Sequence, residues 1–257
     1  MHPRIPAMVA VAFLVIGAFA RADDDVPAFD RPGLAFAAST LPGGSCAAEQ
    51  GLFDASTDRT SGTRSTAYVA DSLVHCGIAD GIELQLGADS WGRLDVHAPS
   101  GAHAVDSGGG DARIGAKVAP WSSGAFSFAM LATFVVPAGR APIGGHVHEH
   151  DLGASMAWTA DDGRSVSLYA DRRWADDGNG NLVAVAYGFP LHAHLGGYIE
   201  SGFGTGALHA REAGGGVTWM LTPRVQLDAS FLRALDRATT DWQAGFGISI
   251  CFAGAHP

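Results

Sequence analysis

The chain has 257 residues, of which 47% are apolar and only 16% are charged, and its formal net charge is −10. An ordinary soluble domain carries roughly 25% charged residues, and so high an apolar content argues against an intrinsically disordered chain. Acids outnumber bases, and Lys117 is the only lysine. No nucleic-acid partner is therefore expected, because such binding depends on clustered basic side chains.

Residues 1–22 are predicted to be a cleaved signal peptide. A weakly basic start at His2 and Arg4 precedes the apolar run 6–20, and Ala20-Arg21-Ala22 has the small-x-small pattern that signal peptidase prefers. The alternative is an uncleaved membrane anchor, but the apolar run is short and lacks strongly basic flanks. We therefore expect export from the cytoplasm.

Period-two alternation of apolar and polar residues dominates the rest of the sequence. In 81–91, for example, Ile82, Leu84 and Leu86 alternate with Glu83 and Gln85. Successive side chains of a strand point to opposite faces, so each such segment has one apolar and one polar face. About twelve strands follow from this pattern, near 44–56, 64–77, 81–91, 110–119, 125–136, 148–159, 164–174, 181–190, 194–204, 210–221, 224–235 and 241–252.

The lengths of these segments and of their connections favour a membrane barrel. The predicted strands are longer than the usual ~5–6 residues of globular strands, and tilted membrane strands need roughly 9–11. Short turns alternate with loops that are mostly longer, as in transmembrane barrels with short periplasmic turns and longer extracellular loops. We predict an all-β, antiparallel, up-and-down transmembrane β-barrel over residues 44–252, and the alternative is a soluble β-sandwich.

The predicted organisation outside the barrel is simple. Residues 23–43 form an N-terminal segment in the periplasm or in the lumen, and residues 253–257 form a C-terminal tail.

The six tryptophans all fall at or near predicted strand ends, where amphipathic indoles form girdles at the level of the lipid headgroups. Four share the parity of their strand's apolar face, whereas Trp91 does not.

Three cysteines, Cys46, Cys76 and Cys251, leave at least one thiol unpaired. A Cys46–Cys76 bridge is compatible with an oxidising compartment. The alternative is that all three serve as small apolar or lumen-filling residues.

Several motifs resemble those of one known family. Residues 219–252 contain Leu221-Thr222-Pro223 at a tight turn, Gln-Leu-Asp-Ala-Ser at 226–230 and an Asp-Trp pair before a closing glycine-rich strand. Further matches lie at 31–33, 41–43, 77–86, 110–119 and 131–139. This chain of motifs resembles a family of outer-membrane channels labelled as the MetA-pathway of phenol degradation. The resemblance implies the outer membrane of a Gram-negative bacterium and the passage of aromatic compounds.

The predicted inward faces carry polar and charged side chains of both signs. They can fill the bore with mutually stabilising ion pairs, or set up a selective field around a narrow aqueous path. We predict that Arg113 and Lys117 face several acids across the lumen. The candidate lumen-lining residues are Glu83, Gln85, Asp111, Arg113, Lys117, Glu200, Gln226, Asp228, Asp241 and Gln243.

A local cluster of histidines is a candidate metal site. His146, His148 and His150 alternate along a strand entry, which would place three imidazoles on one side, and imidazoles suit Zn, Ni or Cu. The alternative is a surface loop that happens to be rich in histidine. No cofactor is otherwise expected.

The sequence thus predicts a channel for passive or facilitated passage of small molecules, hydrophobic or aromatic ones among them. The expected partners are outer-membrane lipids, small-molecule solutes and, because Phe252 resembles the terminal aromatic of barrel proteins, the barrel-assembly machinery. No catalytic residues can be assigned, since the contacts of the serine, histidine and aspartate side chains do not follow from the sequence. Two alternatives remain: a barrel enzyme acting on lipid or surface substrates, and a non-conducting structural surface protein.

Overall fold

A computed structural model describes residues 27–145 and 147–252, so the predicted signal peptide and the tail 253–257 lie outside the described residues. The regular secondary structure of the described part is β-strand throughout. No helix within it is long and apolar enough to cross a membrane. The strands are β1 (Cys46–Gly51), β2 (Asp54–Thr60), β3 (Thr63–Ala79), β4 (Ile82–His97), β5 (His103–Gly108), β6 (Ala112–Ser123), β7 (Phe126–Val136), β8 (Glu149–Thr159), β9 (Ser165–Ala175), β10 (Gly180–His192), β11 (Leu195–Gly206), β12 (Ala210–Thr222), β13 (Val225–Ala234) and β14 (Trp242–Phe252).

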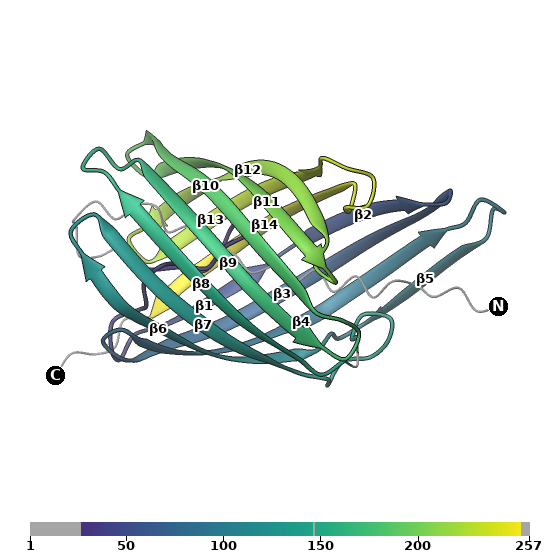
Figure 1. Cartoon of the computed structure of the whole chain (residues 1–257), viewed down its shortest axis with the longest axis horizontal. Helices are drawn as coiled ribbons and strands as arrows, with labels where there is room; N and C mark the ends of the chain where they lie inside the picture. The colour runs from purple at the N-terminus through teal and green to yellow at the C-terminus, as the bar shows by residue number, and fades with distance from the viewer. Residues whose placement is uncertain (1–26, 146, 253–257) are drawn as a thin grey trace.

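These strands form one closed antiparallel barrel (Figure 1). β1 and β2 both pair with β3 and β14, so they act as one interrupted barrel strand. β5 and β6 likewise both pair with β4. The barrel therefore has twelve strands, as the sequence predicts. The β1–β14 pairing closes the described strands into a barrel whose wall has no free edge, and β5, which among them pairs only with β4, extends beyond it.

The outer face of the barrel is apolar and the inner face is polar. In β4, Leu84 and Leu86 are 49% and 59% exposed, whereas the alternating Glu83 and Gln85 are buried. The same alternation follows the other walls, so valine, leucine, isoleucine and phenylalanine side chains cover the outside. A soluble sandwich would bury these side chains between two sheets.

Two predicted loops are largely strand. Residues 57–63 belong mainly to β2 and β3 with a two-residue turn, Ser61-Gly62, and 92–109 form the end of β4 and the paired strand β5. Ser61 and Gly62 both have positive φ. This conformation suits a tight hairpin turn, which explains why a segment rich in polar turn-forming residues continues the sheet instead of leaving it.

A bulge explains the parity of Trp91. Asp71 pairs with Asp89 but Ala70 pairs with Trp91, so Ser90 is an extra residue in β4. An inserted residue reverses the side-chain alternation beyond it. Trp91 is consequently 45% exposed, although its position counted from Glu83 suggests the inner face.

Cys46 and Cys76 form a disulfide between β1 and β3, and Cys251 is a buried free thiol. The bridged pair occupies facing positions of the two antiparallel strands. The sequence left open a Cys46–Cys76 bridge or three unpaired cysteines, and the structure has the bridge.

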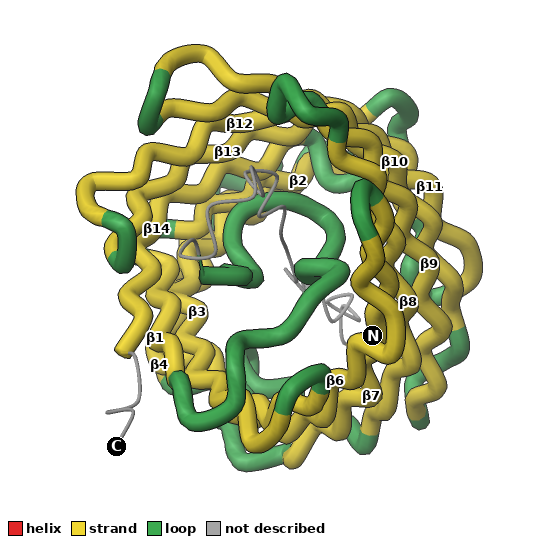
Figure 2. Tube along the Cα trace, turned by 90° about the vertical axis from the view of Figure 1, so that its left-hand side faces the viewer, coloured by secondary structure: helices red, strands yellow, loops and turns green. Residues whose placement is uncertain are grey.

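The segment preceding β1 lies inside the barrel, where Figure 2 shows it as the winding loop within the ring of strands. Within this segment, defined as residues 27–45 and called the lumenal segment below, Phe29, Phe36 and Leu41 are at most 2% exposed. Phe36 packs edge-on against Tyr169 of β9, with ring centroids 5.5 Å apart. The core of the molecule is thus the lumen, filled by a segment that crosses it.

Candidate functional site: the occupied lumen

A buried charge cluster joins the lumenal segment to the wall. The Lys117 ammonium lies 2.8 Å from Asp30 Oδ1 and 3.0 Å from Glu83 Oε1. The His75 ring lies between two carboxylates, with Nε2 2.9 Å from Glu49 Oε1 and Nδ1 2.9 Å from Glu83 Oε1. All five side chains are almost completely buried. Removing one member of such a cluster leaves uncompensated charge in a low-dielectric site, which is strongly destabilising.

Wall carboxylates also accept hydrogen bonds from the backbone of the lumenal segment. Glu83 accepts one from Leu41 N at 2.9 Å, and Glu200 accepts one from Leu34 N at 2.8 Å. Glu49 accepts one from Arg31 N at 2.8 Å. A segment without secondary structure has backbone donors that must be satisfied when buried. Here the carboxylates of the barrel wall accept the hydrogen bonds of these backbone N–H groups.

Arg31 is the second charged anchor of the lumenal segment. Its guanidinium donates to both carboxylate oxygens of Asp54, each at 3.0 Å, and to Asp228 Oδ1 at 3.3 Å. Gln226 Nε2 donates to the Arg31 carbonyl at 2.9 Å. Such two-pronged contacts fix orientation as well as charge. The side chain of Arg31 passes so close to Gly247 that a Cβ at that position would overlap it.

Arg113 pairs with acids of neighbouring strands. Its guanidinium lies 3.0 Å from Asp89 Oδ1 and also contacts Asp71. Asp111 accepts backbone hydrogen bonds from Gly139 and Gly145, each at 2.8 Å. Arg113 therefore ties strands together, and Asp111 holds the long loop between β7 and β8 against the mouth of the barrel.

The ten predicted lumen-lining residues thus divide into two groups. Asp111, Arg113, Gln243 and Asp241 make the contacts of the wall and the rim: Gln243 donates to Glu212 at 2.8 Å, and Asp241 lies before β14, 3.9 Å from Arg59 and 38% exposed. The remaining six all contact the lumenal segment directly. They are Glu83, Gln85, Lys117, Glu200, Gln226 and Asp228.

Sequence reasoning did not single out the partners of these residues. Asp30 and Arg31 lie in a segment without periodicity, so nothing local marks them as lumenal. Glu49 and His75 do follow an inward-facing alternation in β1 and β3, and that parity was the available signal.

A patch of acids and aromatics lines the lumen beside the lumenal segment. A small cavity there is lined by Phe36, Leu131, Tyr169, Asp151 and Asp171, together with Thr133 and Gly153. Carboxylates and aromatic rings in one cavity suit a cationic or a small aromatic solute. The cavity is too small in this state for such a solute to pass.

The described part of the predicted histidine cluster lies on the outer surface. His150 stacks on Trp174, with ring centroids 5.4 Å apart, and His148 is exposed. His146 lies outside the described residues. Metal binding at His146, His148 and His150 remains a prediction.

Two groups of closely spaced ligand atoms do occur among the described residues. One combines Asp30, His75 and Glu83, where the Lys117 ammonium already supplies the positive charge. The other combines Asp95, His97 and His103 on the β4–β5 hairpin, on the same strand as Glu83 but beyond the bulge at Ser90.

Comparison with known proteins identifies a family whose model matches this chain and solved structures with a similar barrel. The family model described as "Putative MetA-pathway of phenol degradation" matches residues 29–252. No curated protein matches the sequence. Among solved structures, an outer membrane channel from Pseudomonas putida F1 has a TM-score of 0.67 at 14% identity, covering 86% of this chain and 99% of that chain.

Two porins share the fold as well. The KdgM porin, solved in complex with disordered oligogalacturonate, has a TM-score of 0.55 at 10% identity and covers 81% of this chain and 99% of its own. The NanC porin has a TM-score of 0.50 at 9% identity, covering 77% of this chain and 99% of its own. At these identities the likeness establishes a common barrel fold.

Proposed function

The chain belongs to the family described as the MetA-pathway of phenol degradation, and from this premise we propose that it is an outer-membrane channel for passive or facilitated passage of small molecules. One observation carries the proposal: a closed barrel with an apolar exterior surrounds a charged interior. Lipid can replace water around the outer face, while the polar inner face can serve a solute path.

The outer membrane of a Gram-negative bacterium is the compartment that this architecture fits, with its lipids as partners of the outer face. The turns at 80–81, 124–125, 193–194 and 223–224 have two residues each and would face the periplasm. The lumenal segment joins β1 at this end, where Gly44 N donates to Gly77 O at 2.8 Å. The same proposal includes insertion of the barrel into this membrane by the barrel-assembly machinery, which would recognise the strand that ends in Phe252.

The lumenal segment is the proposed gate. It occupies the bore through the anchors of Asp30 and Arg31 and through its buried phenylalanines. A solute can pass only if part of this segment moves, because close-packed side chains leave little free volume. In this proposal the filled lumen is the closed state of the channel.

Small aromatic compounds are the proposed solutes. The family description names phenol, and Phe36 and Tyr169 line the lumen beside the acids Asp151 and Asp171. Aromatic faces bind flat rings, and acids accept hydrogen bonds from hydroxyl groups.

Ionic current across planar bilayers tests conduction. We expect small, infrequent currents from the mature protein and larger, sustained currents from a variant that lacks residues 27–43. Slower migration after heating on a detergent gel verifies that both are folded barrels before recording. Folded barrels of both kinds without current would contradict the proposal, as would hydrolysis of ester substrates without conduction.

Block of this current by phenol tests the solute class. The deletion variant lacks Phe36 but keeps Tyr169, Asp151 and Asp171. Phenol should therefore still reduce its current, and Tyr169→Ser in that background should weaken the block several-fold. Tyr187→Ser is the matched control, because Tyr187 is 38% exposed on the outer face of β10. Equal block in both tyrosine variants would exclude the aromatic wall as the solute path.

A further inference from the structure

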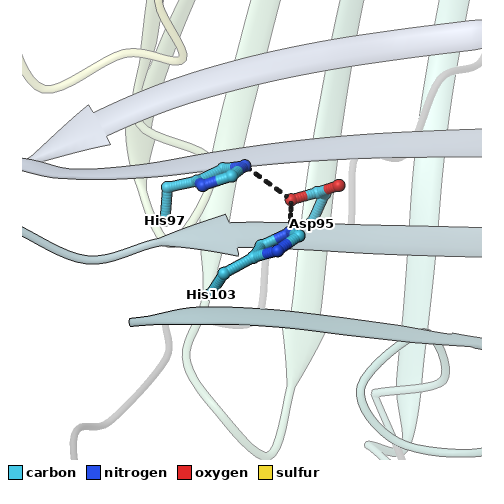
Figure 3. Close-up of side chains that lie close together, drawn as sticks. All are labelled: Asp95, His97 and His103. Atoms are coloured by element: carbon cyan, nitrogen blue, oxygen red, sulfur yellow. Dashed lines mark hydrogen bonds and ion pairs between the residues drawn. The ribbon is translucent and has the colours of Figure 1, made fainter. Parts of the chain in front are cut away.

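Three potential metal ligands converge on the β4–β5 hairpin (Figure 3). Asp95 Oδ1 lies 3.0 Å from His97 Nε2 and 2.7 Å from His103 Nε2. The two imidazole rings are stacked, with centroids 4.1 Å apart and planes 6° from parallel. Both rings therefore direct their Nε2 atoms towards the same oxygen, Asp95 Oδ1.

The hairpin itself produces this convergence. Asp95 and His97 are two residues apart in β4 and so share a face, and His97 pairs directly with His103 of β5. Side chains of directly paired residues lie close enough to act together. The connection 98–102 is closed by hydrogen bonds from Ala98 N to the Ala102 carbonyl and from Gly101 N to the Ala98 carbonyl, so the backbone presents the three ligands without a long mobile loop.

The cluster lies beyond the apolar band of the barrel. Trp91 precedes Asp95 by four residues, which corresponds to roughly 13 Å along a strand. Because the bulge at Ser90 precedes both, Asp95 and His97 share the outward parity of Trp91. The His97 and His103 side chains are 57% and 47% exposed. A water-borne ion can therefore reach them without entering the lumen or the lipid.

The donor set indicates which ion would bind. Imidazole nitrogens suit Zn, Cu(II) and Ni(II), whereas Mg and Ca prefer oxygen ligands. Arg93 Nη2 lies 3.5 Å from Asp95 Oδ2 and so engages the other carboxylate oxygen. This contact leaves Oδ1 directed at the imidazoles and orients the carboxylate, as outer partners of metal ligands commonly do.

We propose that Asp95, His97 and His103 form a surface binding site for a divalent transition-metal ion of the Zn, Cu(II) and Ni(II) class. Two imidazoles and one carboxylate supply three ligands, and water completes the coordination. Binding would hold the end of β4 to β5, a strand whose only sheet partner among the described residues is β4. The site is independent of conduction, so its failure and that of the channel proposal are separable.

The competing explanation is a purely hydrogen-bonded cluster, in which each imidazole N–H donates to Asp95 and no metal binds. A second histidine–aspartate contact in the molecule shows what such a pair looks like. His209 Nε2 lies 3.1 Å from Asp236 Oδ2 in an exposed loop region, without a second imidazole. It provides the matched control for a test of metal affinity.

Competition with a chromogenic chelator measures Zn²⁺ and Cu²⁺ affinity of the mature protein, folded in detergent and prepared without a polyhistidine tag. His97→Gln and His103→Gln should each weaken binding at this site by at least about tenfold, the loss typical even for outer partners of a metal. Asp95→Asn should weaken it as well. His209→Gln should bind like the unaltered protein, and excess Mg²⁺ should not compete.

Electron paramagnetic resonance of the bound Cu²⁺ gives a second readout. The unaltered protein should show coupling to two imidazole nitrogens, and either histidine variant should show coupling to one. Unchanged affinity and spectrum in both His97→Gln and His103→Gln would overturn the proposal. So would loss of the site in a His148→Gln/His150→Gln variant, because binding would then belong to that cluster.

Discussion

The ammonium of Lys117, on β6, lies 2.8 Å from the carboxylate of Asp30, on the lumenal segment, and both side chains are almost completely buried. The two residues are separated by 87 positions in the sequence. Their contact holds the lumenal segment to the wall with the only lysine of the chain. The lumenal ion pairs therefore act first as structural anchors, which is one of the two roles that the sequence left open for them.

Replacing Lys117 by methionine should loosen the lumenal segment. Asp30 and Glu83 would lose their common cation, and breaking a buried charge pair typically costs about 3–5 kcal/mol. Displacing the segment relieves that cost, so channel openings should become more frequent and proteolysis within 27–45 faster. Arg164→Gln, at an exposed turn, is the control, and identical opening rates in both variants would contradict the anchoring role.

Reversing the charge of the same residue should change ion selectivity. Lys117→Glu adds an acid to a bore that already carries Asp30 and Glu83, and fixed charges in a narrow path favour counter-ions. The reversal potential in a salt gradient should move towards that of a cation-selective pore. An unchanged reversal potential would show that ions pass elsewhere than along this wall.

Gly77 should not tolerate a side chain. A Cβ at this position of β3 would overlap the carbonyl oxygens of Leu41 and Pro42, near the end of the barrel at which the lumenal segment joins β1. Overpacking of this kind typically costs about 1–3 kcal/mol. Gly77→Ala should therefore lower the temperature at which the barrel loses its heat-resistant gel mobility. Gly108→Ala, with its nearest atom 3.7 Å away, should leave that temperature unchanged.

The disulfide predicts a simple thiol count. Unfolded protein without reductant should react with one equivalent of thiol reagent, at Cys251, and with three after reduction. Cys46→Ser/Cys76→Ser should be less stable by about 2–4 kcal/mol, the usual contribution of such a link. Detection of three free thiols in protein isolated without reductant would contradict the bridge.

The loop 235–241 should respond to acid. A hydrogen bond from the Thr239 hydroxyl lowers the pKa of Asp236 to about 2, and His209 and nearby backbone N–H groups act in the same direction. A carboxyl with a lowered pKa stabilises the folded loop at every pH above its ordinary pKa of 3.8. This stabilisation is lost as the pH falls through about 2.

NMR titration of the Asp236 side-chain carbon tests this assignment. The midpoint should lie near 2 and should rise towards the ordinary value in Thr239→Ala, because the largest stabilising contact of the carboxylate is gone. A midpoint that stays low in Thr239→Ala would assign the shift to the other donors instead.

Much of the barrel follows from local pattern. Alternation of the kind seen in 81–91 depends only on neighbouring residues, because successive side chains of a strand must face opposite ways. That is why twelve strands were predictable, and why Glu83, Gln85 and Lys117 were recognised as inward-facing candidates. Trp91 departs from the pattern because the extra Ser90 reverses parity, and a bulge depends on the partner strand rather than on the bulged strand alone.

The contacts of the lumen arise differently. Arg31 meets Asp228 across 197 positions, and Asp95 meets His103 only because a hairpin aligns β4 with β5. Periodicity assigns a residue to a face but not to a partner, and the lumenal segment has no periodicity at all. The positions of the strands, and the face to which each side chain points, therefore follow from neighbouring residues in the sequence. The ion pairs and the filled bore depend on closure of the barrel, because only closure brings distant charges together in a space that excludes water.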